Sequence, residues 1–225
     1  MTERLFEFDV DGARSSALFY PAAGACGAVV LAHGAGGRQN HPWMVQVARA
    51  IASRGVDVVT FDFLYTHAGR RVPDKAPLLE ATWAAAIGAV RARGDVAHRR
   101  LFIGGKSMGG RIATQLAASG AAGALEGLVL LGYPLHPPGK PELLRTAHLG
   151  RIREPMLFVQ GTRDVFGGPD ELRPFVEAAP MRARIFPIES GDHSLTPPKK
   201  SGTSLATVVD TVADEVARFV VNPRA

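Results

Sequence analysis

The sequence predicts an α/β fold with a mostly parallel, twisted sheet and helices on both faces. Three observations support this prediction. Short β-branched segments alternate with segments of helical periodicity, an early strand segment is apolar throughout, and glycine-rich turns follow several of the strand segments. Continuous apolar strands are typical of parallel sheets that are buried on both faces. The alternation predicts right-handed crossovers, in which each helix packs back onto the sheet.

The predicted strands begin with an antiparallel hairpin and continue as single segments. Residues 4–10 and 13–20 flank an Asp11-Gly12 turn, which is typical of a hairpin. The segment Gly27–Ala32 (GAVVLA) has no polar side chain and is therefore expected to be buried. The remaining predicted strands are Val56–Phe63, Leu101–Ile103, Leu128–Leu131, Met156–Val159 and Arg184–Ile188.

The predicted helices lie between these strands. The string Asn40-His41-Pro42 supplies a candidate cap and a proline near the first helical turn, and apolar residues at helical spacing then continue to Gly55. The other predicted helices are Pro77–Arg93, Ile112–Ala118, Glu171–Ala178 and a last one from about Ser204 to Val220. The proline-rich stretch from Tyr133 to Pro155 predicts a stiffened surface segment, too short for a large helical lid. No linker or repeat divides the chain, so we expect a single domain over residues 1–225.

The composition is that of an ordinary globular protein. The 225 residues are 46% hydrophobic and 21% charged, which argues against a disordered or fibrous chain. The single cysteine, Cys26, excludes an internal disulfide framework and a structural zinc site built from two or more thiolates.

Charge and hydropathy exclude two classes of partner. The net charge of +5 comes from 26 Lys and Arg against 21 Asp and Glu, but the cations are scattered and aromatic residues are few at 7%, so no nucleic-acid partner is expected. Glu3 and Glu7 do not suit a secretory signal, and no segment approaches the ~18 consecutive apolar residues of a membrane span. We therefore expect a cytoplasmic protein that does not bind membranes.

A candidate nucleophile lies in the string GKSMG, residues 105–109, between a predicted strand and a predicted helix. This G-x-S-x-G pattern at a strand-to-helix junction is typical of a nucleophile elbow, whose tight turn needs small residues on both sides of the serine. Gly105 and Gly109 meet that requirement around Ser107, with Gly104 and Gly110 as further small residues. The alternative is a phosphate-binding P-loop, but that motif needs a glycine where this chain has Arg100.

A serine hydroxyl needs a base and an orienting carboxylate, and both follow later strands. Asp164 follows the predicted strand Met156–Val159, and His193 follows the last one. In a parallel sheet both loops lie at the same edge as Ser107. Asp170, Asp192 and Asp62 are the alternative acids, and the alternative for His193 is a purely structural histidine.

Acyl transfer also needs hydrogen-bond donors for the developing oxyanion. One is expected to be the backbone N–H of Met108, the residue after the nucleophile. The loop HGAGG, residues 33–37, follows an early strand and offers the N–H of Ala35 as the second donor. The alternative for this loop is a plain glycine-rich turn.

With these motifs in this order, the chain resembles the α/β-hydrolase superfamily over nearly its whole length. The strings GKSMGGR (105–111), GYPLHPPGK (132–140) and FVQGTRD (158–164) resemble a dienelactone-hydrolase-like subgroup. That subgroup includes small predicted bacterial hydrolases and the hydrolase-like domain of testis-expressed and chromatin-complex proteins. The resemblance implies a serine hydrolase without a large lid. Dienelactone hydrolases proper use a cysteine nucleophile, so their lactone substrate is not carried over.

Two functions are expected, the first from the ordered candidate residues and the second from the resemblance. The first is hydrolysis of an ester or related acyl bond in a small to mid-sized soluble substrate by Ser107, His193 and Asp164, with no metal or organic cofactor. The second, implied by the chromatin relatives, is a non-catalytic interaction module that keeps the fold.

Several residues near these loops are candidates for contact with a substrate. Pocket candidates, which are equally suited to packing, are Tyr133, Leu135, His136 and Phe166. Three cations lie close in sequence to the proposed loops, namely Arg38, Lys106 and Arg111. They either select an acyl group that bears a carboxylate or are ordinary surface cations.

Overall fold

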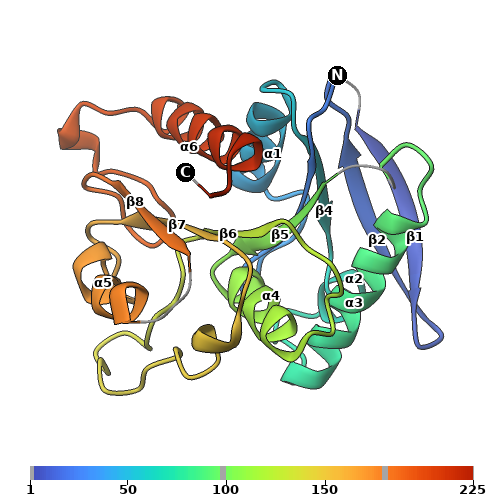
Figure 1. Ribbon diagram of the computed structural model, residues 1–225, viewed down its shortest axis with the longest axis horizontal. Coiled ribbons are helices and arrows are strands. Elements are labelled where there is room, and N and C mark those ends of the chain that lie inside the picture. Colours follow the sequence, from blue (N-terminus) through green and yellow to red (C-terminus); the bar gives the residue numbers. More distant parts are fainter. Residues whose placement is uncertain (1–2, 97–99, 179–181, 225) are drawn as a thin grey trace.

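The computed structural model describes residues 3–96, 100–178 and 182–224. Within these ranges eight strands form one sheet. They are β1 (Arg4–Val10), β2 (Ala13–Tyr20), β3 (Ala28–Ala32), β4 (Asp57–Phe61), β5 (Leu101–Lys106), β6 (Gly127–Leu131), β7 (Met156–Gly161) and β8 (Ala183–Ile188). Their order across the sheet is β1-β2-β4-β3-β5-β6-β7-β8 (Figure 1).

The sheet is mostly parallel. The hairpin of β1 and β2 is antiparallel, and β2 joins β4 in the antiparallel sense, whereas every pair from β4 to β8 across the sheet is parallel. The predicted α/β class is therefore confirmed. Strands β3, β4, β6 and β7 are buried along their whole length, which explains why their sequences are mostly apolar.

Helices cover both faces of the sheet (Figure 1). They are α1 (Pro42–Ala52), α2 (Leu64–His67), α3 (Ala76–Arg91), α4 (Met108–Ser119), α5 (Pro169–Ala178) and α6 (Leu205–Val221), with short 3₁₀ turns η1 (Leu149–Arg151) and η2 (Lys199–Ser201). Helices α1 and α6 pack together on one face, over Val29, Leu31 and Val159. Helices α3, α4 and α5 cover the other face.

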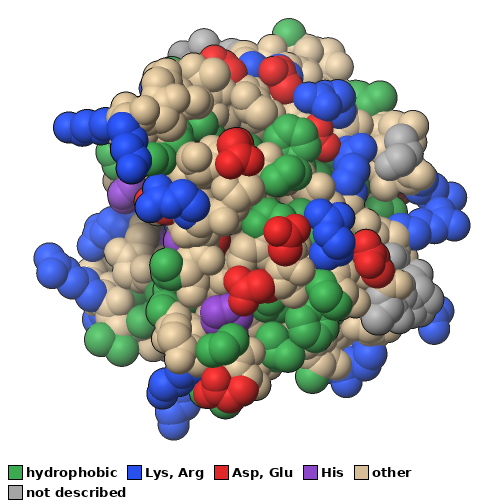
Figure 2. Space-filling model, turned by 90° about the vertical axis from the view of Figure 1, so that its left-hand side faces the viewer, with side chains coloured by type: hydrophobic (Ala, Val, Ile, Leu, Met, Phe, Trp, Pro, Cys, Tyr) green, Lys and Arg blue, Asp and Glu red, His purple; other side chains and the backbone are tan. Residues whose placement is uncertain are grey.

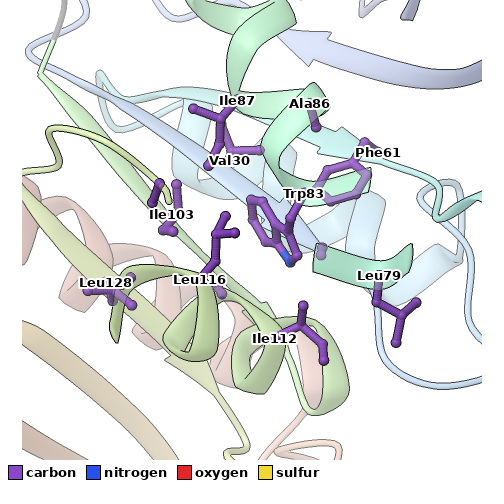
Figure 3. Close-up of a cluster of buried hydrophobic side chains, with 14 of the residues drawn as sticks. Val30, Phe61, Leu79, Trp83, Ala86, Ile87, Ile103, Ile112, Leu116 and Leu128 are labelled. Atoms are coloured by element: carbon purple, nitrogen blue, oxygen red, sulfur yellow. The ribbon is translucent and has the colours of Figure 1, made fainter. Parts of the chain in front are cut away.

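Trp83 is the largest side chain of the core beneath α3 and α4. It is fully buried, and its ring meets Phe61 edge-on with centroids 4.7 Å apart. Figure 3 shows it among Leu79 from its own helix and Ile112 from α4. Its indole Nε1 donates a hydrogen bond of 3.2 Å to the carbonyl of Gly109, so the start of α4 is fixed directly to the core.

The strand order changes direction at β3. The chain passes from β3 to β4 on one side and later returns to β5 on the other. Such a switch leaves a crevice beyond the carboxyl ends of the two strands, where ligands of open α/β sheets bind. The loops after β3 and β5 both open onto this crevice, and they carry HGAGG and Ser107.

Residues 132–155 connect β6 to β7 without a long helix, and η1 is the helical turn within them. This agrees with the expected absence of a large lid. Among the described residues, no helix is both long and apolar enough to cross a bilayer. On the face drawn in Figure 2, Lys and Arg side chains are interspersed with Asp and Glu side chains.

Candidate active site

Ser107 lies in a sharp turn between β5 and α4. Its φ of +50° is in the left-handed region, which residues with side chains rarely adopt. Added Cβ atoms at Gly105 and at Gly109 would both collide with the carbonyl of Ala32 in β3, so this turn requires glycine on each side of the serine. These are the features of a nucleophile elbow, which raises the serine above the end of the sheet.

A chain of hydrogen bonds runs from Ser107 through His193 to Asp164. The Ser107 Oγ and the His193 Nε2 are 2.8 Å apart. The His193 Nδ1 is 2.8 Å from one oxygen of Asp164 and 3.0 Å from the other. A carboxylate only accepts, so Nδ1 carries the proton and Nε2 is left as the acceptor for the serine hydroxyl.

Asp164 is held by donors other than the histidine. Its side chain is fully buried. Its Oδ1 accepts from the backbone N–H of Phe166 at 2.8 Å, and its Oδ2 accepts from Nε2 of Gln160 at 3.0 Å. Gln160 also bonds both backbone groups of Tyr133 and the carbonyl of Gly167. The sequence interpretation missed this glutamine, although a polar residue at the end of the apolar strand β7 was a visible signal.

Two neighbours hold His193 in place, one at its ring and one at its backbone. The ring of Phe166 lies against it with centroids 4.1 Å apart and an interplanar angle of 31°. The Lys106 Nζ donates to the His193 carbonyl at 3.3 Å, which ties the histidine loop to the end of β5. Burial lowers the pKa of Lys106, while the charges of Asp164 and Asp192 act in the opposite direction.

The loop after β3 lies against Ser107. A Cβ added to Gly34 would be 3.4 Å from the Cβ of Ser107, and Ala35 and Met108 line the same cavity as the serine. His33 fixes the loop from below. Its Nδ1 donates to the carbonyl of Gly34 at 2.8 Å, and its Nε2 accepts from the N–H of Phe63 at 3.3 Å. Burial lowers the pKa of His33, which favours the neutral ring that this pairing needs.

A family described as an alpha/beta hydrolase domain matches residues 25–221. The chain belongs to this family. Dienelactone hydrolase from Anabaena variabilis ATCC 29413 has a TM-score of 0.76 at 20% identity, covering 98% of this chain and 97% of that one. A serine hydrolase without a lid from Xanthomonas campestris has a TM-score of 0.73 at 17% identity, covering 99% and 95%.

A third solved structure, Est1E from Butyrivibrio proteoclasticus with ferulic acid bound, has a TM-score of 0.74 at 15% identity. It covers 96% of this chain and 98% of that one. At such identities the likeness concerns the fold. Together with the family match, it confirms the predicted resemblance to dienelactone-hydrolase-like alpha/beta hydrolases.

The cavity of this alpha/beta hydrolase has a volume of about 460 Å³. Ser107, His193 and Phe166 line it, together with Ala35 and Met108. This volume is in the range of small-molecule sites, ~300–1,000 Å³. A larger hollow of about 760 Å³ lies between β8 and α6, and no residue of the Ser107–His193–Asp164 chain lines it.

Of the four pocket candidates, only Phe166 lines the cavity. Tyr133, Leu135 and His136 are buried behind its wall. The Tyr133 hydroxyl donates to the carbonyl of Arg145 at 2.7 Å, and burial raises the pKa of Tyr133 to about 12. The His136 Nε2 lies 3.1 Å from a carboxylate oxygen of Glu171. These three side chains turn inward after β6, where they support the segment that forms the wall.

The predicted cations separate into two groups. Lys106 and Arg111 line the cavity, whereas Arg38 lines a different hollow of about 440 Å³ with Arg70 and Arg71. Arg145, which the sequence interpretation did not single out, is a third cation of the cavity wall. In the part of the chain that the structure describes, no group of three or more His, Cys, Asp or Glu side chains could hold a metal ion.

Proposed function

We propose that the protein hydrolyses an ester or related acyl bond through an acyl-enzyme on Ser107. The observation that carries this proposal is the hydrogen-bonded chain from Ser107 through His193 to Asp164 at the edge of a cavity. Such a chain supplies a nucleophile, a general base and the group that orients the base.

In the first half of the reaction, the Oγ of Ser107 attacks the carbonyl carbon of the substrate while Nε2 of His193 takes the hydroxyl proton. Asp164 stabilises the imidazolium and keeps Nδ1 directed toward itself. The N–H groups of Ala35 and Met108 receive the oxyanion of the tetrahedral intermediate. His193 then gives its proton to the leaving oxygen, and the bond to the alcohol breaks.

In the second half, a water molecule replaces the alcohol. His193 takes a proton from the water, whose oxygen attacks the acyl carbon, and the proton returns to the Oγ of Ser107 as the acid leaves. The net reaction consumes one ester and one water and yields an acid and an alcohol. The cavity volume of about 460 Å³ and the short connection between β6 and β7 favour a small to mid-sized substrate.

The test is hydrolysis of 4-nitrophenyl hexanoate, together with covalent labelling by a fluorophosphonate. We expect Ser107→Ala to abolish labelling and to lower kcat by about 10⁴-fold or more. Asp164→Asn should cost about 10⁴-fold in kcat, because the amide favours the wrong histidine tautomer.

Asp170→Asn is the matched control, since Asp170 is an exposed carboxylate on α5 and should leave activity unchanged. Wild-type activity in Ser107→Ala would refute the assignment. A folded wild-type protein that neither cleaves esters nor reacts with the probe would favour the non-catalytic alternative.

A further inference from the structure

Two arginines from separate elements meet in the wall of the cavity. Arg111 is one helical turn after Ser107, and its N–H donates to the Ser107 carbonyl at 3.0 Å. Helical side chains lean toward the N-terminal end of their helix, which here is the end that carries Ser107. Arg145 comes from the irregular segment between β6 and β7. Its backbone is fixed by hydrogen bonds to Leu135 and to the Tyr133 hydroxyl, at 2.8 and 2.7 Å.

Neither guanidinium has a carboxylate partner among the described residues. Arg111 makes a long hydrogen bond of 3.4 Å to Gln115, and Arg145 makes one of 3.4 Å to the carbonyl of Pro134. A guanidinium carries five N–H donors, so most of the donors on each remain available. Glu80 is within electrostatic range of Arg111 but forms no ion pair with it in the described structure.

Asp74 is a carboxylate that lines the cavity, and it already has hydrogen-bond and ion-pair partners. Asp74 pairs with the guanidinium of Arg70 at 2.7 Å and accepts from the N–H of Tyr65 at 3.1 Å. Among the described residues, the cavity wall therefore has three cations, Lys106, Arg111 and Arg145, and one carboxylate, Asp74, whose ion-pair partner lies outside the wall.

The positive charges in this region lower the pKa values of two nearby groups. Burial and the charge of Arg145 lower the pKa of Arg111. Burial, followed by the charges of Arg111 and Arg151, lowers the pKa of His148 to about 4. Two partly buried like charges are unfavourable together, and an anion between them would relieve both the burial cost and the repulsion.

We propose that Arg111 and Arg145 form a carboxylate subsite, and that the substrate is an ester whose acyl chain ends in a carboxylate. Guanidinium groups pair with carboxylates through two parallel hydrogen bonds, which would fix the far end of the acyl chain. This subsite rests on the proposed function, ester hydrolysis at Ser107. The net reaction stays the same, since one ester and one water give a dicarboxylate and an alcohol.

The test compares two esters with acyl chains of equal length, 4-nitrophenyl hexanoate and mono(4-nitrophenyl) adipate. Wild-type protein should prefer the adipate ester in kcat/KM. Arg111→Gln and Arg145→Gln should each lower the ratio of the two kcat/KM values by about 10- to 100-fold, the range for a hydrogen bond to a charged group. Arg14→Gln is the control, because Arg14 is an exposed hairpin residue that does not line the cavity, and its loss removes one positive charge and an exposed ion pair with Glu7.

A second readout does not depend on turnover. Ser107→Ala protein should bind monomethyl adipate more tightly than methyl hexanoate in calorimetry, and adding Arg111→Gln should remove the difference. Active protein with equal kcat/KM for both esters would overturn the subsite and leave the proposed function standing. Inactive protein that still binds monomethyl adipate through Arg111 would overturn the proposed function and leave the subsite standing. Inactive protein that binds neither ester would overturn both.

Discussion

Gln160 is predicted to hold Asp164, the carboxylate of the proposed triad, in place. Its side chain is buried and joins Asp164, Tyr133 and Gly167 through four hydrogen bonds of 2.7–3.1 Å. Gln160→Met keeps the length of the side chain and removes all four. The carbonyl of Tyr133 keeps a donor in the N–H of Leu135, at 3.0 Å, and Asp164 keeps His193 and Phe166. Two buried groups, the N–H of Tyr133 and the carbonyl of Gly167, thus lose their side-chain partner.

The expected cost follows from these two groups. At ~1–3 kcal/mol for each, the free energy of unfolding should fall by about 3 kcal/mol. For a chain of this size that corresponds to a drop in Tm of about 6–12 °C. Asp164 also loses a donor that orients it, so kcat for 4-nitrophenyl hexanoate should fall by about 10-fold, well short of the ~10⁴-fold expected for Asp164→Asn.

Calorimetric melting and steady-state kinetics measure the two effects in one preparation. Gln46→Met is the matched control, since Gln46 is exposed on α1 and should change neither Tm nor kcat. If Gln160→Met melts like the wild type and keeps its kcat within twofold, the hydrogen bonds of Gln160 do not position Asp164.

Two further predictions concern stability. Gly104→Ala should destabilise the protein by about 3 kcal/mol or more, because its Cβ would collide with the backbone of Val129 in β6. Gly94→Ala, with open space around the new methyl group, should be nearly neutral in urea unfolding. His148 stays neutral in the folded state down to about pH 4 but is protonated near pH 6.5 when unfolded, so stability should fall as the pH drops from 6.5 toward 4. His148→Gln should lose part of this fall, and equal pH dependence in both proteins would contradict it. His33 acts in the same direction and remains in the variant.

The order of strands and helices could be predicted because buried parallel strands need apolar segments. Two predicted boundaries were wrong, and both for the same physical reason. Strand β5 continues to Lys106 and α4 begins at Met108, whereas the prediction ended the strand at Ile103 and began the helix at Ile112. Glycines in this stretch lower both strand and helix propensity. Tertiary packing requires them, since Gly104 lies against Val129 and Gly109 against Ala32. The short helix α2 was missed because four residues give no periodicity.

In the candidate site, too, the sequence predicted some residues and not others. Ser107, Asp164 and His193 could be singled out because each lies in the turn or loop after a strand, and the topology brings these loops to one edge of the sheet. The pocket wall could not be read in this way. In an irregular segment the direction of each side chain depends on local turns, so Tyr133, Leu135 and His136 point inward while Arg145, farther along, lines the cavity.

Arg145 shows what the short connection between β6 and β7 contributes in a hydrolase without a large lid. A large lid would exclude water and bind a long substrate through apolar contacts. Residues 132–155 contain one 3₁₀ turn and form no such lid. Selectivity then has to come from a few fixed polar groups in an open cavity. The Tyr133 hydroxyl fixes the Arg145 carbonyl, and Gln160 bonds both Tyr133 and Asp164. The same buried glutamine therefore supports the acid of the proposed triad and, through Tyr133, one half of the proposed carboxylate subsite, so Gln160→Met should also lower the preference for the adipate ester.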